Sequence, residues 1–130
     1  MSTQDQSAQL LAKAKHLSTL LVQTIHNAED GDRQLGDDSG TWRSKFSCLI
    51  ESTAAFKELV REVSCVLENN QKASLEFFSV CDTVFHKIQH EIEEWLTGDV
   101  RPDDVQALTE WLYSARPALF LVLEFNARYV

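Results

Sequence analysis

Glycine and proline are scarce in this chain, and the few that occur are confined to two regions. The glycines are Gly31, Gly36, Gly40 and Gly98, and both prolines follow Gly98. Residues 41–97 therefore contain neither residue type. A strand usually ends in a turn after about 5 to 10 residues, and turns depend on these residue types, so a segment this long does not fold as sheet. The sequence predicts an all-α protein.

Targeting signals and paired cysteines are also missing. The N-terminal sequence MSTQDQSAQLL has no basic region followed by an apolar stretch, and no window approaches the ~18 apolar residues of a membrane span. The cysteines, Cys48, Cys65 and Cys81, are odd in number and widely spaced, which argues against a disulfide framework and against a zinc site. These features favour an intracellular, cytoplasmic location with reduced thiols.

The charge is strongly acidic, with a formal net charge of -8. The basic residues are scattered along the chain, whereas nucleic-acid binders concentrate Lys and Arg on one face, so we expect no nucleic-acid partner. The acidic residues gather in one segment, where only Arg101 opposes them: Glu91, Glu93, Glu94, Asp99, Asp103, Asp104 and Glu110. This segment is either a solvated face or a surface that attracts a basic partner. In the second case Glu91, Glu94 and Asp103 are candidate contacts.

The length of 130 residues and the hydrophobic content of 44% match one soluble domain that spans residues 1–130. Apolar residues recur at three- and four-residue steps, which predicts helices over about 3–28, 41–68, 72–97 and 102–128. Between the first two helices, the acidic, glycine-rich stretch EDGDRQLGDDSG is typical of an exposed loop.

The second and third predicted helices carry the clearest apolar stripes. In the second, the stripe is Trp42, Phe46, Leu49, Thr53, Phe56, Val60, Val63 and Leu67. In the third, it is Leu75, Phe78, Cys81, Phe85, Ile88, Ile92 and Trp95. Such stripes pack against other helices at shallow angles, within one chain or between chains.

Residues 41–97 fit either two helices or one. A single helix would be roughly 85 Å long and would require a partner chain. The polar sequence Glu68-Asn69-Asn70-Gln71-Lys72 favours a reversal at Asn69-Asn70, because asparagine tolerates the left-handed conformation that ends helices. A break there gives helices of similar length, as an antiparallel up-down four-helix bundle requires.

The last predicted helix contains Pro117, which removes an amide donor and clashes with the preceding turn. We expect a kink there, or a break that would give five helices. The segment that follows, ALFLVLEF, is apolar nearly all the way round, with Phe120 and Leu121 in excess of the core stripe. Two interpretations remain open: a kink buries this segment across the end of the bundle, or Phe120, Leu121 and Phe125 form an exposed interface.

Signatures of chemistry are weak. His86 and His90 stand four residues apart with Glu94 beyond them, a spacing that suits a shared metal or a phosphoryl carrier, but neither HExxH nor Glu-x-x-His occurs. In the loop DGDRQLGDD, Leu35 stands where a calcium loop has its glycine, Gln34 replaces a carboxylate, and Thr41 stands in place of the bidentate glutamate. No nucleophile elbow or phosphate loop is present. We therefore expect no catalytic residues, no metal and no cofactor.

The sequence contains no motif of a specific family, and its architecture is that of helical adaptor and scaffold domains, an analogy of fold alone. The functional hypothesis is a non-enzymatic module that binds a helix or segment of a protein partner through an apolar helical surface. Self-association through the heptad stripes is the first alternative, and a metal or phosphoryl carrier that uses His86 and His90 is the second. The apolar ending NARYV is typical of a domain cut from a longer chain.

Overall fold

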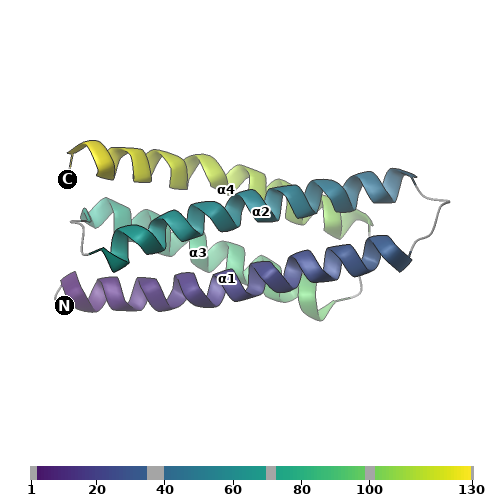
Figure 1. Ribbon diagram of the computed structural model, residues 1–130, viewed down its shortest axis with the longest axis horizontal. Helices are drawn as coiled ribbons and strands as arrows, with labels where there is room; N and C mark the ends of the chain where they lie inside the picture. The colour runs from purple at the N-terminus through teal and green to yellow at the C-terminus, as the bar shows by residue number, and fades with distance from the viewer. Residues whose placement is uncertain (1–2, 35–39, 70–72, 99–101, 130) are drawn as a thin grey trace.

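A computed structural model describes residues 3–34, 40–69, 73–98 and 102–129 (Figure 1). These residues form the helices α1 (Thr3–Gln34), α2 (Gly40–Glu68), α3 (Leu75–Thr97) and α4 (Pro102–Tyr129), and no strand occurs among them. Consecutive helices run in opposite directions along the long axis (Figure 1). The predicted all-α, up-down four-helix bundle is confirmed. Within the described part of the chain, no helix has a stretch long and apolar enough to cross a membrane.

The four helices occupy the corners of a square in an order that differs from their order in the chain. α1 packs mainly against α2 and α3, and α4 also packs mainly against α2 and α3. Consequently α2 and α3 lie across one diagonal, and α1 and α4 lie across the other. Because directions alternate along the chain, α4 runs parallel to its neighbour α2 and antiparallel to its neighbour α3 (Figure 1).

The division between α2 and α3 confirms the two-helix interpretation of residues 41–97. Asn69 forms a turn after α2, while Asn70 lies outside the described residues. α3 begins at Leu75 and not near residue 72, because the Ser74 side chain accepts a hydrogen bond from the Phe77 amide and caps the helix. The Ser74 amide in turn donates to Oδ1 of Asn126, a buried residue of α4, at 3.2 Å. This contact fixes the start of α3 against α4.

The first helix extends further than expected. Residues 29–34, which we assigned to the acidic loop, form the last turns of α1. Gly31 is accommodated there because its Cα faces α2: an added Cβ would lie 2.8 Å from Cζ of Phe46, whose ring is only 2% exposed. The glycine thus permits close packing of α1 on α2, so its role is in the helix interface and not in a turn. The rest of the predicted loop, residues 35–39, lies outside the described residues.

The core is lined by the predicted stripes with a few changes. In α2, Thr53 is fully buried and its hydroxyl donates to the Leu49 carbonyl, while the Trp42 side chain lies outside the described residues. In α3, Leu75 does not belong to the core, because it is the first residue of the helix and is 77% exposed. Phe77, which the stripe omitted, is fully buried in its place.

Candidate interaction surface

Large exposed apolar side chains gather on α4. Among the described residues, five large hydrophobic side chains are exposed, and four of them belong to this helix: Tyr113 (66% exposed), Phe120 (59%), Leu121 (65%) and Phe125 (43%). The fifth, Leu75, lies on the side of α3 that faces α1. The sequence left open whether Phe120, Leu121 and Phe125 are buried or exposed, and the structure places all three at the surface.

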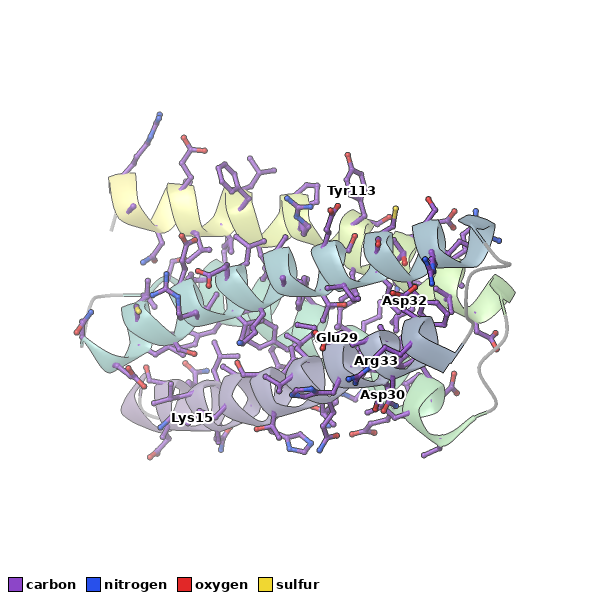
Figure 2. All side chains as sticks on the ribbon, turned by 45° about the vertical axis from the view of Figure 1, so that its right-hand side comes forward. Lys15, Glu29, Asp30, Asp32, Arg33 and Tyr113 are labelled. Atoms are coloured by element: carbon purple, nitrogen blue, oxygen red, sulfur yellow. The ribbon has the colours of Figure 1, made fainter. Side chains whose placement is uncertain are left out.

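These side chains share one side of the helix because of their spacing. Tyr113, Pro117, Leu121 and Phe125 follow one another at four-residue steps, and Phe120 lies one turn from Pro117. Together we call these five residues the apolar face of α4. Tyr113 points away from the bundle (Figure 2). Leu112 and Leu119, each one position before an exposed residue, turn by about 100° toward the core and are fully buried.

Pro117 does not divide the helix. α4 continues without a break from Pro102 to Tyr129, so the predicted break and the resulting five-helix arrangement are wrong. Pro117 is itself exposed, and its ring occupies the solvent side of the helix, where the carbonyl of Tyr113 that loses its amide donor can be hydrated. Because the segment after Pro117 continues along the bundle instead of crossing its end, Phe120 and Leu121 remain uncovered.

The apolar face borders an open groove on each side of α4. The groove toward α2 has a volume of about 660 Å³, and the groove toward α3 has a volume of about 760 Å³. Leu121 belongs to both grooves and therefore separates them. The apolar lining from the neighbouring helices consists of Ala55 and Leu59 of α2 and Val80 of α3. Such volumes suit the side chains of a docked helix.

Charged residues of both signs surround this face. Arg61 and Glu58 of α2 form an ion pair at 2.9 Å, and Arg128 and Glu124 of α4 form another at 2.9 Å. The guanidinium of Arg116 lies 5.7 Å from the centre of the Tyr113 ring. An apolar centre with a charged border is the usual composition of a protein interface.

The predicted acidic contacts lie on a different surface. Glu91 is half-buried and Glu94 is exposed, and both line a smaller cleft between α3 and α4 together with Trp95 and Asp104. Asp104 precedes Phe120 by 16 positions, or about 24 Å along the helix. The side chain of Asp103 lies outside the described residues. The structure therefore brings Glu91 and Glu94 together but separates them from Phe120, Leu121 and Phe125.

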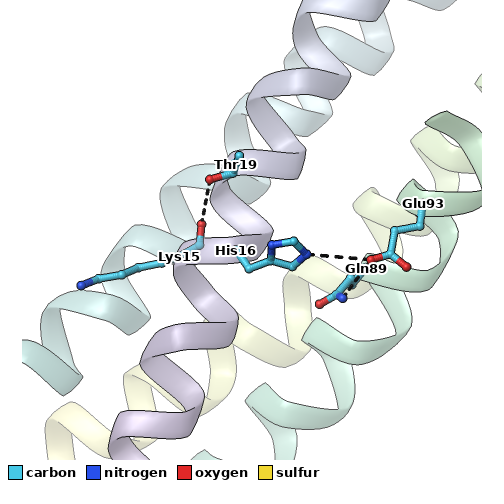
Figure 3. A network of polar contacts seen from close by, with 5 residues as sticks. All are labelled: Lys15, His16, Thr19, Gln89 and Glu93. Carbon is cyan, nitrogen blue, oxygen red and sulfur yellow. Dashed lines mark hydrogen bonds and ion pairs between the residues drawn. The ribbon is translucent and has the colours of Figure 1, made fainter.

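The histidines of α3 have acidic neighbours and are exposed. His90 Nε2 lies 3.2 Å from Oε1 of Glu94. Potential ligand atoms of His90, Glu91 and Glu94 lie within 4.8 Å of one another, and His86 is not part of this group. A separate contact joins α1 to α3, where His16 Nε2 lies 3.9 Å from Oε1 of Glu93, which also accepts a hydrogen bond from Gln89 (Figure 3). Of these contacts, the one between His16 and Glu93 joins two helices, whereas the other two lie within α3.

The cysteines differ in accessibility. Cys48 and Cys65 are exposed, whereas Cys81 is fully buried in the core. Burial, together with a smaller effect of the neighbouring Asp82 carboxylate, raises the pKa of the Cys81 thiol from 9.0 to about 12.

Alkaline pH is therefore expected to destabilise the bundle through Cys81. Between pH 9 and 12 the thiol ionises in the unfolded chain but not in the folded one, so the free energy of unfolding falls by about 1.4 kcal/mol per pH unit. Below pH 9 the thiol is protonated in both states and contributes no slope. Urea titrations of wild type and Cys81→Ala at pH 8, 9, 10 and 11 measure this difference. An equal slope in the two proteins would contradict the prediction.

Tyr113 and Pro117 are the members of the apolar face that sequence reasoning missed. Their signal was present, because they continue the four-residue spacing of Leu121 and Phe125 toward the N-terminus. Proline was interpreted only as an element that disrupts helices, and its apolar ring was overlooked.

Comparison of the sequence with family models gives no match, and comparisons with curated proteins and with solved structures give none either. The function must therefore be argued from this surface.

Proposed function

We propose that the protein is a non-enzymatic interaction module that binds an amphipathic helix of another polypeptide chain along α4. The observation that carries this proposal is the apolar face, in which four side chains that are 43% to 66% exposed lie on one side of a single helix. Isolated exposed apolar residues are common on soluble proteins, but a contiguous group of this kind usually marks an interface.

The shape of the surface supports a helix as the occupant. The two grooves run on either side of α4, and Leu121 stands between them. A docked helix that straddles α4 would place apolar residues, spaced by three and four positions, into both grooves. The charged residues that border the face would then meet polar residues of the occupant and fix its position.

The acidic cleft around Glu91 and Glu94 belongs to this proposal only as a remote contact. At about 24 Å from Phe120, it would meet basic residues that lie beyond the docked segment of a long partner helix. The carrier alternative has narrower support, since the group formed by His90, Glu91 and Glu94 comes from a single helix and Glu94 already pairs with His90.

Site-specific photo-crosslinking tests the proposed docking site. A benzophenone amino acid replaces Leu121 in cells that express the chain, and the crosslinked peptides are sequenced. We expect an adduct that maps to one helical segment of one partner chain. A matched control carries the same amino acid at Leu75, which is 77% exposed but lies on the side of α1. Equal adducts at both positions, or no adduct at Leu121, would contradict the proposal.

A further inference from the structure

We propose that the helix that occupies the apolar face is α4 of a second copy of this chain, packed antiparallel about a two-fold axis that passes the outer side of α4 at the level of Leu119, whose own side chain faces the core. This inference rests on the proposed docking function and identifies its occupant. The argument for a second copy is a symmetry in the sequence of α4, in which side chains at equal distances from Leu119 complement one another. Binding of a partner of unrelated sequence would not require this symmetry.

The residues of the outer side of α4 form complementary pairs at equal distances from Leu119. Two positions away on either side are Pro117 and Leu121, and six positions away are Tyr113 and Phe125. A two-fold axis beside Leu119 would therefore place Pro117 against Leu121 of the second copy and Tyr113 against Phe125 of the second copy. Both of these pairs are apolar, and the outer pair is aromatic, as suits a self-complementary interface.

The charges at the ends of the apolar face obey the same symmetry. Glu110 and Arg128 each lie nine positions from Leu119, about 13 Å along the helix in opposite directions. They are 18 residues apart, which is five full helical turns, so both point outward along the same line as the apolar residues. In an antiparallel pair Glu110 meets Arg128 of the second copy, and the two-fold axis makes this contact twice.

The same charges favour the antiparallel pair over a parallel pair in register. With the helices parallel and in register, Glu110 would face Glu110, and Arg128 would face Arg128, so like charges would repel at both ends. Both side chains are exposed in the single chain. Arg128 pairs there with Glu124 of its own helix, and Glu110 accepts a hydrogen bond from Gln106, both exposed contacts that cost little to exchange.

The other apolar stripes cannot supply the contact. The heptad stripe of α2, which could have mediated self-association, is used inside the bundle: Phe46, Leu49, Phe56, Val60 and Val63 are at most 2% exposed. Of the large exposed apolar side chains that the structure describes, only Leu75 lies outside α4. Self-association of the folded chain is thus directed to α4.

Sedimentation velocity of the purified chain, from about 1 to 500 µM, measures the equilibrium. The runs need about 150 mM salt, because the net charge of -8 on each copy opposes association and is screened there. We expect a reversible dimer. Glu110→Arg and Arg128→Glu should each weaken it about tenfold, because each change turns two attractive contacts into repulsive ones.

Two recombinations of these charges test the antiparallel geometry. The double variant Glu110→Arg with Arg128→Glu restores opposite charges and should recover the affinity of the wild type. An equimolar mixture of the two single variants should form a heterodimer, since each charge then meets its opposite. Glu29→Arg makes the same change in net charge as Glu110→Arg, but on α1, diagonally opposite α4, and should leave the dimer unchanged (Figure 2). Circular dichroism checks that every variant is folded.

The outcomes separate this inference from the docking function on which it rests. Two results would overturn the second copy as occupant: a chain that stays monomeric at 500 µM, or a dimer whose affinity is unchanged by both single charge reversals. If the photo-crosslinker at Leu121 then joins a different protein, the docking function stands without self-association. If it joins nothing, both proposals fail. A crosslink to residues around Pro117 of the same sequence supports both.

Discussion

Phe120→Asp is expected to leave the bundle folded and to weaken binding at the apolar face of α4 at least about 30-fold. The side chain is 59% exposed, so a carboxylate at this position remains in water, and we expect the free energy of unfolding to fall by only about 1 kcal/mol. In a complex the same carboxylate would be buried among apolar groups without a partner. Loss of a central aromatic contact typically costs 2 kcal/mol or more, which corresponds to this factor.

The measurement combines thermal unfolding by circular dichroism with crosslinking yield from Leu121. Leu75→Asp is the matched control, because it places the same carboxylate at an exposed apolar position near α1. Leu75→Asp should change neither the melting temperature nor the crosslinking yield by much. If Phe120→Asp folds and binds like the wild type, Phe120 does not belong to the contact. If it unfolds, the exposure of this residue, and with it the proposed surface, is wrong.

The sequence was sufficient to predict the helices, because their signals are local. The absence of glycine and proline over residues 41–97, the three- and four-residue apolar steps, and the paired asparagines after α2 each reflect a preference of the backbone or of one helix face. These features led to four helices and to most core residues. The error at Leu75 also has a local cause, since the first turn of a helix is capped by Ser74 and its first side chain projects beyond the core.

Features that depend on contacts between helices could not be predicted. Gly31 looks like a loop residue until Phe46 of α2 is seen packed against it. The diagonal placement of α2 and α3 leaves no signature in either stripe, because an apolar stripe specifies which side is buried but not which helix covers it. Asn126 is buried and accepts a hydrogen bond from the Ser74 amide, 52 positions earlier, a contact that nothing in the sequence of α4 indicates.

The candidate surface could be predicted only in part, because its exposure also depends on how the helices are arranged. The excess of apolar residues after Pro117 singled out Phe120 and Leu121, and both are exposed. Whether they were buried depended on the course of α4 beyond the proline, which the sequence did not determine. The prediction that Glu91 and Glu94 contact the same partner did not say how far they lie from Phe120. An extended helix separates positions by about 1.5 Å per residue, so the two groups lie at different ends.

Leu119→Asp is expected to unfold the protein, although it lies next to Phe120. Leu119 is fully buried against the core, and loss of its side chain alone would cost about 2 to 5 kcal/mol. The aspartate adds the cost of a carboxylate that has no partner in an apolar interior, several kcal/mol more. Since small domains have total stabilities of about 5 to 15 kcal/mol, this change removes most or all of the stability.

The same substitution at two adjacent positions thus gives opposite results, which makes the pair a test of the orientation of α4. Helical content at 222 nm and urea unfolding distinguish them: Phe120→Asp should unfold near the wild-type midpoint, whereas Leu119→Asp should lack a cooperative transition. Leu119→Ala should lie between the two. If α4 were rotated by one position, the order of the two aspartate variants would reverse. The core would then contain Phe120, and the apolar face could not be a docking surface.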